Sequence, residues 1–282
     1  MVEHHLAKVR VAGSNPVVRS IFRLSRFRRY LLAGLAVFAV SCSGGAENRQ
    51  VISVAAASDL RQAFGELGAA FTNQTGATVE FSFGSSGQLR EQIINGAPFD
   101  VYASANSAYV DDVINAGKGD ATTRVVYTKG RLALVVADSA PMPANLADLQ
   151  NTTYRRIVIA NPQHAPYGLA AKETLVSLGI FGAIQDRLIY GENISDALRI
   201  VQSGNADAAL VALSLIIQSN DDYLVVPESL HQPINQTLVV TAPQKTKSIA
   251  IRFVKFVTSQ AGLAIMSRYG YEQPDPVSTV TP

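Results

Sequence analysis

Short apolar runs alternate with amphipathic stretches from residue 51 to about residue 270, and this alternation predicts strands and helices in turn. The expected strands are 51–56, 79–83, 99–104, 123–128, 131–137, 156–160, 188–190, 207–213, 223–226 and 236–241. The expected helices are 60–71, 88–95, 107–116, 146–149, 169–178, 196–203, 248–259 and 262–269. Strands that alternate with helices over this length predict an α/β fold with mostly parallel sheets.

Two of these strands lead into a helix through a serine. Strand 51–56 is followed by Ser58, which we expect to cap its helix, and strand 79–83 is followed by Gly-Ser-Ser-Gly with Ser86. The first N–H groups of such helices are unpaired and lie at the positive end of the helix dipole, so they suit an anion. A serine cap without a ligand explains either turn alone, but the repetition favours an anion site. Asp59 would repel that anion, so we expect it to face outward.

Four loops precede helices at the carboxyl ends of predicted strands, where ligands bind in α/β sheets. These loops hold Ser58, Ser86, Tyr167 and Ile194, and in the last of them Ser195 is expected to cap helix 196–203. A site built from helix starts and hydroxyl groups, without a committed Lys or Arg, favours a small tetrahedral oxyanion.

The first 41 residues have the layout of a secretory signal. Four arginines at 23–29 precede an apolar run at 31–40, which is too short to span a bilayer as a mature helix. Cys42 follows and is the only cysteine, so no disulfide can form within the chain. Residues 39–42 resemble the bacterial lipoprotein processing site, which implies lipidation of Cys42, although Ala39 stands where that pattern usually has Leu. Ordinary signal cleavage with an incidental cysteine is the alternative.

The composition and the net charge indicate which classes of partner to expect. The chain has 282 residues, 48% of them hydrophobic, which suits globular domains with real cores. Residues 1–41 carry seven basic residues and one acidic residue, so the rest of the chain has a net charge of −4 although the whole has +2. Nucleic acid is therefore not an expected partner, and any anion site must be local.

Several spaced motifs carry a resemblance to a known family. Residues 54–58, 83–86, 95–101, 164–168 and 268–271 resemble the periplasmic molybdate-binding proteins of ABC transporters. The resemblance spans about residues 51–271 and implies the two-lobed periplasmic-binding-protein architecture, with the ligand cleft between the lobes. It implies an exported protein, in the periplasm or on the outer face of the membrane, that captures molybdate or tungstate and delivers it to an ABC permease.

The resemblance also implies roles for single residues. It assigns hydroxyl and N–H contacts to Ser58 and Ser86, and backbone N–H contacts to Tyr167 and Ile194. A fifth family contact, a Tyr hydroxyl, falls at Ala212 and is missing here. Two replacements are open: the Tyr167 hydroxyl reaches into that space, or Tyr167 packs outward as a lid edge and Ser214 or a water molecule fills the gap.

The lobe limits follow from the same resemblance. We expect a linker at 42–50, a first lobe from 51–130 and 237–275, a second lobe at 131–236, and a tail at 276–282. The chain would cross between lobes near residues 128–131 and 233–237. The apolar residues of helix 248–259, among them Phe253, Val254, Phe256 and Val257, would then lie in the core and not in the site.

Other classes of protein fit less well. A binding protein for another oxyanion, such as sulfate or phosphate, is the main alternative. A secreted hydrolase is remote, because after residue 41 only His164 and His231 could act as a base, and Gly-Ser-Ser-Gly is not a nucleophile elbow. No His cluster or Tyr-Tyr pair indicates a cation site, and no cofactor is expected.

Overall fold

The computed structural model describes residues 50–243 and 245–274. The predicted signal segment 1–41, Cys42, the rest of the linker up to residue 49 and the 276–282 tail lie outside these residues. The strands are β1 (Val51–Ala57), β2 (Thr78–Gly84), β3 (Val101–Ser104), β4 (Val125–Gly130), β5 (Leu132–Val136), β6 (Ile157–Ala160), β7 (Leu188–Gly191), β8 (Ala208–Ala212), β9 (Leu224–Val225) and β10 (Ile234–Val240). The α-helices are α1 (Arg61–Thr75), α2 (Ser86–Ile94), α3 (Ser107–Asn115), α4 (Pro166–Ser177), α5 (Phe181–Ile184), α6 (Ile194–Gln202), α7 (Lys247–Val257) and α8 (Gln260–Arg268). Short 3₁₀ turns include η1 (Ser58–Leu60), η3 (Leu146–Gln150) and η5 (Leu213–Leu215).

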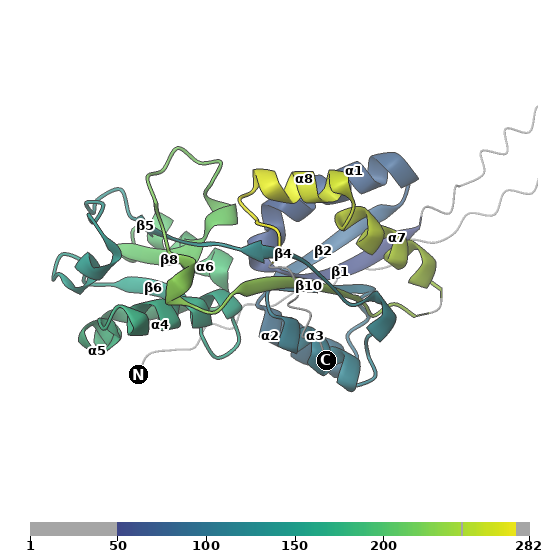
Figure 1. The fold of residues 1–282 in the computed structure, drawn as a ribbon, viewed down its shortest axis with the longest axis horizontal. Coiled ribbons are helices and arrows are strands. Elements are labelled where there is room, and N and C mark those ends of the chain that lie inside the picture. The colour runs from purple at the N-terminus through teal and green to yellow at the C-terminus, as the bar shows by residue number, and fades with distance from the viewer. Residues whose placement is uncertain (1–49, 244, 275–282) are drawn as a thin grey trace, which may run out of the picture. The chain divides into compact units, whose positions relative to one another are not determined.

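The first sheet has the strand order β2-β1-β3-β10-β4 (Figure 1). Strand β1 pairs in parallel with β2 and β3, and its interior positions are almost completely buried. A strand that is covered on both faces needs a nearly continuous apolar run, which explains the pattern of residues 51–57. In α1, Phe64 and Phe71 lie on the buried face and contact Phe253 of α7, with ring centroids 6.2 and 5.3 Å away. The expectation that Phe253 belongs to the core is confirmed.

The second sheet has the order β7-β6-β8-β5-β9. Strands β6, β7 and β8 are parallel, and helices α4 and α6 pack against this sheet. Strand β8 is buried at all five positions. Because both of its faces are covered, its sequence is a continuous run of apolar residues. The two sheets with their helices form the two lobes of the predicted α/β architecture.

Both sheets are mixed, although mostly parallel sheets were expected. In the first sheet β10 runs antiparallel to β3 and β4, and in the second β5 runs antiparallel to β8 and β9. The reason is that β5 and β10 are the strands through which the chain enters the other lobe, so they approach their sheets from the opposite end. Only Arg131 separates β4 from β5 at the first crossing.

The lobe limits given above remain our proposal, and sheet membership supports them. Strand β10 joins the first sheet from Ile234, three residues before the expected limit at 237. Helices α7 and α8 contact α1 of the first lobe. Among the described residues no single helix is long and apolar enough to cross a membrane. Helices α7 and α8 together have the length and composition of a span, but they meet at a 60° bend. Both bury apolar residues in the core, such as Val257 and Met266.

Candidate functional site

The four residues that the sequence singled out lie around one small cavity between the two sheets. Ser58 follows β1, Ser86 follows β2, Tyr167 follows β6 and Ile194 follows β7. The carboxyl ends of parallel strands meet at one edge of a sheet, and the two edges face each other here. The other residues that line the cavity are Ala57, Asp59, Gly84, Ser85, Ala105, Ala165 and Pro166.

The two serine hydroxyls are held so that each can donate into the cavity. Ser58 Oγ accepts a hydrogen bond from the Ser195 N–H at 3.3 Å, and Ser86 Oγ accepts one from the Ala105 N–H at 3.1 Å. Among the described residues neither hydroxyl has an acceptor for its own proton. A hydroxyl group carries one donor and two acceptor positions, so each serine keeps its donor for a ligand that only accepts.

Backbone N–H groups add to this set of donors. Tyr167 and Ile194 lie in the first turns of α4 and α6, and in the part of the chain that the structure covers no partner is found for either N–H. Such groups lie at the positive ends of the helix dipoles. No Lys or Arg is among the residues that line the cavity, so its donors are neutral.

Two expected helix caps are wrong. Ser58 is itself the first residue of η1, which has no side-chain cap, and α6 is capped by Asn193, whose side chain accepts from the Asp196 N–H. Ser195 lies inside the helix, and its hydroxyl donates to the Ser58 carbonyl at 3.0 Å. The Ser58 and Ser195 hydroxyls therefore make hydrogen bonds between the lobes. These tertiary contacts compete with local helix capping at both turns.

Asp59 does not face outward, contrary to expectation. Its side chain is 1% exposed, and Oδ2 accepts hydrogen bonds from Gln236 Nε2 at 2.7 Å and from the Tyr271 hydroxyl at 2.8 Å. Burial raises the pKa of Asp59 to about 6, against the opposing effect of the hydrogen bonds from Tyr271 and Gln236. The carboxyl group can be buried because distant parts of the chain supply its donors.

The Tyr167 side chain also points into the interior. It is 2% exposed, and a Cβ added at Gly130 would lie 1.9 Å from its hydroxyl oxygen. The hydroxyl lies near Asp59 and Gln236 but makes no hydrogen bond among the described residues. Outward packing of Tyr167 as a lid edge is therefore wrong.

Ala212 and Ser214 are not among the residues that line the cavity. Ala212 ends β8 opposite Leu132, and the Ser214 hydroxyl donates to the backbone carbonyl of Asp59 at 2.8 Å. Ser214 also lies 3.2 Å from the Tyr271 hydroxyl. Ser214 therefore belongs to a cluster of polar side chains, the Asp59 cluster, which we define as Asp59, Tyr167, Ser214, Gln236 and Tyr271.

Sequence reasoning missed the role of His164, which it treated as an ordinary loop residue. The Ser85 hydroxyl donates to the His164 carbonyl at 2.6 Å and lies 2.8 Å from His164 Nδ1. The Gly87 N–H donates to the same carbonyl at 2.9 Å. These bonds join the first lobe to the second beside the cavity. The signal for this contact was Gly87 itself, since a glycine inside a helix indicates a close backbone approach.

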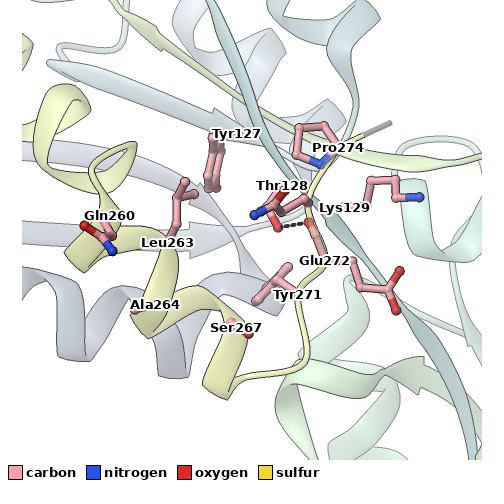
Figure 2. Close-up of a pocket in the computed structure, with 11 residues that line it drawn as sticks. Tyr127, Thr128, Lys129, Gln260, Leu263, Ala264, Ser267, Tyr271, Glu272 and Pro274 are labelled. Atoms are coloured by element: carbon pink, nitrogen blue, oxygen red, sulfur yellow. Dashed lines mark hydrogen bonds between the residues drawn. The ribbon is translucent and has the colours of Figure 1, made fainter. Parts of the chain in front are cut away.

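A wider groove lies behind the Asp59 cluster, between β4, α8 and the C-terminal segment (Figure 2). Tyr127, Leu263 and Tyr271 line it, and the Thr128 hydroxyl donates to the Glu272 carbonyl along its wall. None of the four predicted site residues reaches this groove. No group of three His, Cys, Asp or Glu suited to a metal ion occurs among residues 50–243 and 245–274.

Comparison with known proteins identifies the family. Residues 52–272 match the model of the bacterial extracellular solute-binding proteins. The molybdate-binding protein ModA of Rhodobacter capsulatus is 34% identical to this chain, over 78% of this chain and 87% of that protein. The putative ABC transporter substrate-binding lipoprotein YvgL of Bacillus subtilis is 25% identical, over 87% of this chain and 98% of that protein.

A solved structure agrees with the fold. The periplasmic molybdate-binding protein of Azotobacter vinelandii superposes with a TM-score of 0.74 at 31% identity, and the match covers 79% of this chain and 99% of that one. The agreement includes both lobes, since it spans nearly the whole of the solved chain. This chain therefore belongs to the bacterial extracellular solute-binding proteins and is a homologue of the molybdate-binding protein ModA.

Proposed function

We propose that this protein captures molybdate or tungstate outside the cytoplasm and delivers it, chemically unchanged, to the membrane subunits of an ABC transporter. The observation that carries this proposal is the cavity, in which hydroxyl and N–H donors from four helix starts converge without a cationic side chain. Such donors suit a small oxyanion, which only accepts hydrogen bonds. The names of the relatives from Rhodobacter capsulatus and Azotobacter vinelandii support molybdate as this oxyanion.

Within this proposal each site residue has a defined task. Ser58 and Ser86 donate through their hydroxyls, and Tyr167 and Ile194 donate through their backbone N–H groups. All four contacts go to oxygen atoms of the ion, so no side chain coordinates a metal atom. These four residues are at most 3% exposed, so little water competes for their donors and the hydrogen bonds are strengthened.

Titration with four oxyanions tests the proposal. Binding of molybdate or tungstate should stabilise the fold by about 2.7 kcal/mol when the ligand is a hundredfold above its dissociation constant. Calorimetric titration and melting curves with molybdate, tungstate, sulfate and phosphate would measure this, each ion against chloride at equal ionic strength. Preferred binding of sulfate or phosphate would change the assigned ion. A melting temperature unmoved by millimolar amounts of all four would contradict an oxyanion-binding function.

We further propose that the mature protein starts at a lipidated Cys42 and stays on the outer face of a membrane. The relative from Bacillus subtilis is named as a lipoprotein, which supports an anchor of this kind. Acyl chains hold a protein stably at a bilayer. Cys42→Ala is expected to stop lipid labelling and alter processing, with Ser43→Ala as the matched control. A parent protein found only in the soluble fraction would favour plain signal cleavage.

A further inference from the structure

The carboxyl group of Asp59 is buried where the two lobes meet, and Asp59 is one of the residues that line the cavity. Asp59 lines the cavity next to Ser58, and its Oδ2 is bonded to Gln236 of β10 and to Tyr271 near the C-terminus. The second lobe completes the enclosure, because η5 places Ser214 against the Asp59 carbonyl and α4 places Tyr167 beside the carboxyl group. The burial of Asp59 therefore depends on the two lobes being together.

Among the described residues, no Lys, Arg or His side chain makes a hydrogen bond or an ion pair with this carboxyl group. The titratable groups that face it are the hydroxyls of Tyr127 from β4, Tyr167 from α4 and Tyr271, and burial raises the pKa of each. These hydroxyls are neutral, and the largest contribution to the raised Asp59 pKa is burial. Asp59 Oδ1 has no hydrogen-bond partner among the described residues, so this oxygen is free to carry a proton.

We propose that Asp59 takes up one proton from solvent when the oxyanion binds, so that the carboxyl group beside the bound dianion is neutral. The proton bonds to a carboxylate oxygen, and no electron is transferred. This inference rests on the proposed oxyanion-binding function and adds a residue to that site. It gives the protein a means to hold a dianion next to an acidic residue without a cation, because the like charge is removed.

The direction of the pH dependence follows from linkage. Burial raises the pKa of Asp59 to about 6, and a nearby dianion raises it further because like charges disfavour the ionised form. Affinity should therefore fall as pH rises through the interval between these two pKa values, by up to about tenfold per pH unit. Above that interval the affinity should be independent of pH.

The test is a set of calorimetric titrations with micromolar molybdate between about pH 6 and about pH 8.5. Each titration is repeated in two buffers with different heats of ionisation. The difference between the two binding enthalpies gives the number of protons taken up per ion bound. The parent should take up a substantial fraction of one proton and bind more weakly at high pH. Asp59→Asn should lose both effects and bind at high pH about as tightly as the parent does at low pH. Asp120→Asn is the control, since Asp120 is half-buried outside the cavity, pairs with Lys247 at 2.8 Å and should leave the parent's pH dependence unchanged.

The outcomes separate this inference from the function on which it rests. Molybdate binding without proton uptake in the parent, or an unchanged pH dependence in Asp59→Asn, would overturn the inference and leave the proposed function intact. Failure of molybdate, tungstate and sulfate to bind at any pH would overturn both. The proton count in the parent needs no variant, so it decides the matter even where Asp59→Asn fails to fold.

Discussion

The double variant Ser58→Ala/Ser86→Ala is expected to lose about 3 to 6 kcal/mol of oxyanion binding, since each hydrogen bond to a charged ligand contributes about 1.5 to 3 kcal/mol. Each single variant should show about half of this loss. The reason lies in the hydrogen bonds of the two hydroxyls, which accept from Ser195 and Ala105 and keep their protons for the ligand. Calorimetric titration of the parent, both single variants and the double variant with molybdate would measure the effect.

The fold of these variants should change less than their affinity. Each substitution removes the side-chain acceptor of one backbone N–H group, at a cost of about 1 kcal/mol, so melting without ligand must be measured alongside binding. Ser177→Ala is the matched control, because the Ser177 hydroxyl is exposed, donates to the Leu230 carbonyl and does not line the cavity. If the double variant bound as tightly as this control, the two serines would only hold the loops in place.

Gly87→Ala is expected to weaken binding by about 1 to 3 kcal/mol, the usual cost of overpacking, while the protein stays folded. A Cβ at this position would lie 2.7 Å from the His164 carbonyl oxygen and 2.9 Å from His164 Cβ. His164 belongs to the second lobe and Gly87 to the first, so the collision arises only when the lobes close over the cavity. Titration with molybdate measures the loss, and small-angle scattering with and without ligand shows whether closure is reduced.

Gly65→Ala is the matched control for this experiment. Gly65 is also a helical glycine of the first lobe, in α1, but an added Cβ would meet nothing within 4 Å. Glycine in a helix is less stable than alanine by about 1 kcal/mol, so both substitutions should stabilise their helix by a similar amount. Only Gly87→Ala should weaken binding. Equal affinity in the two variants would mean that the contact with His164 is not part of ligand binding.

The sequence by itself predicted all ten strands, every α-helix except α5, and the loops that meet at the cavity, although the expected helix 146–149 is the 3₁₀ turn η3. Local patterns carry this information, because an apolar run or a 3.6-residue period reflects which side of each element is buried. Ser58, Ser86, Tyr167 and Ile194 could be selected for a similar reason: each follows a predicted strand and begins or precedes a helix. Their roles in binding stay predictions until the titrations are done.

The tertiary structure alone decided the direction of the crossing strands and the surroundings of Asp59. The local pattern around Asp59 describes an acid in the first turn of a helix, for which exposure is the ordinary expectation. Its partners Ser214, Gln236 and Tyr271 lie 155, 177 and 212 residues further along the chain. Burial of a carboxyl group depends on whether donors reach it, and donors this distant come together only when both lobes have folded and met.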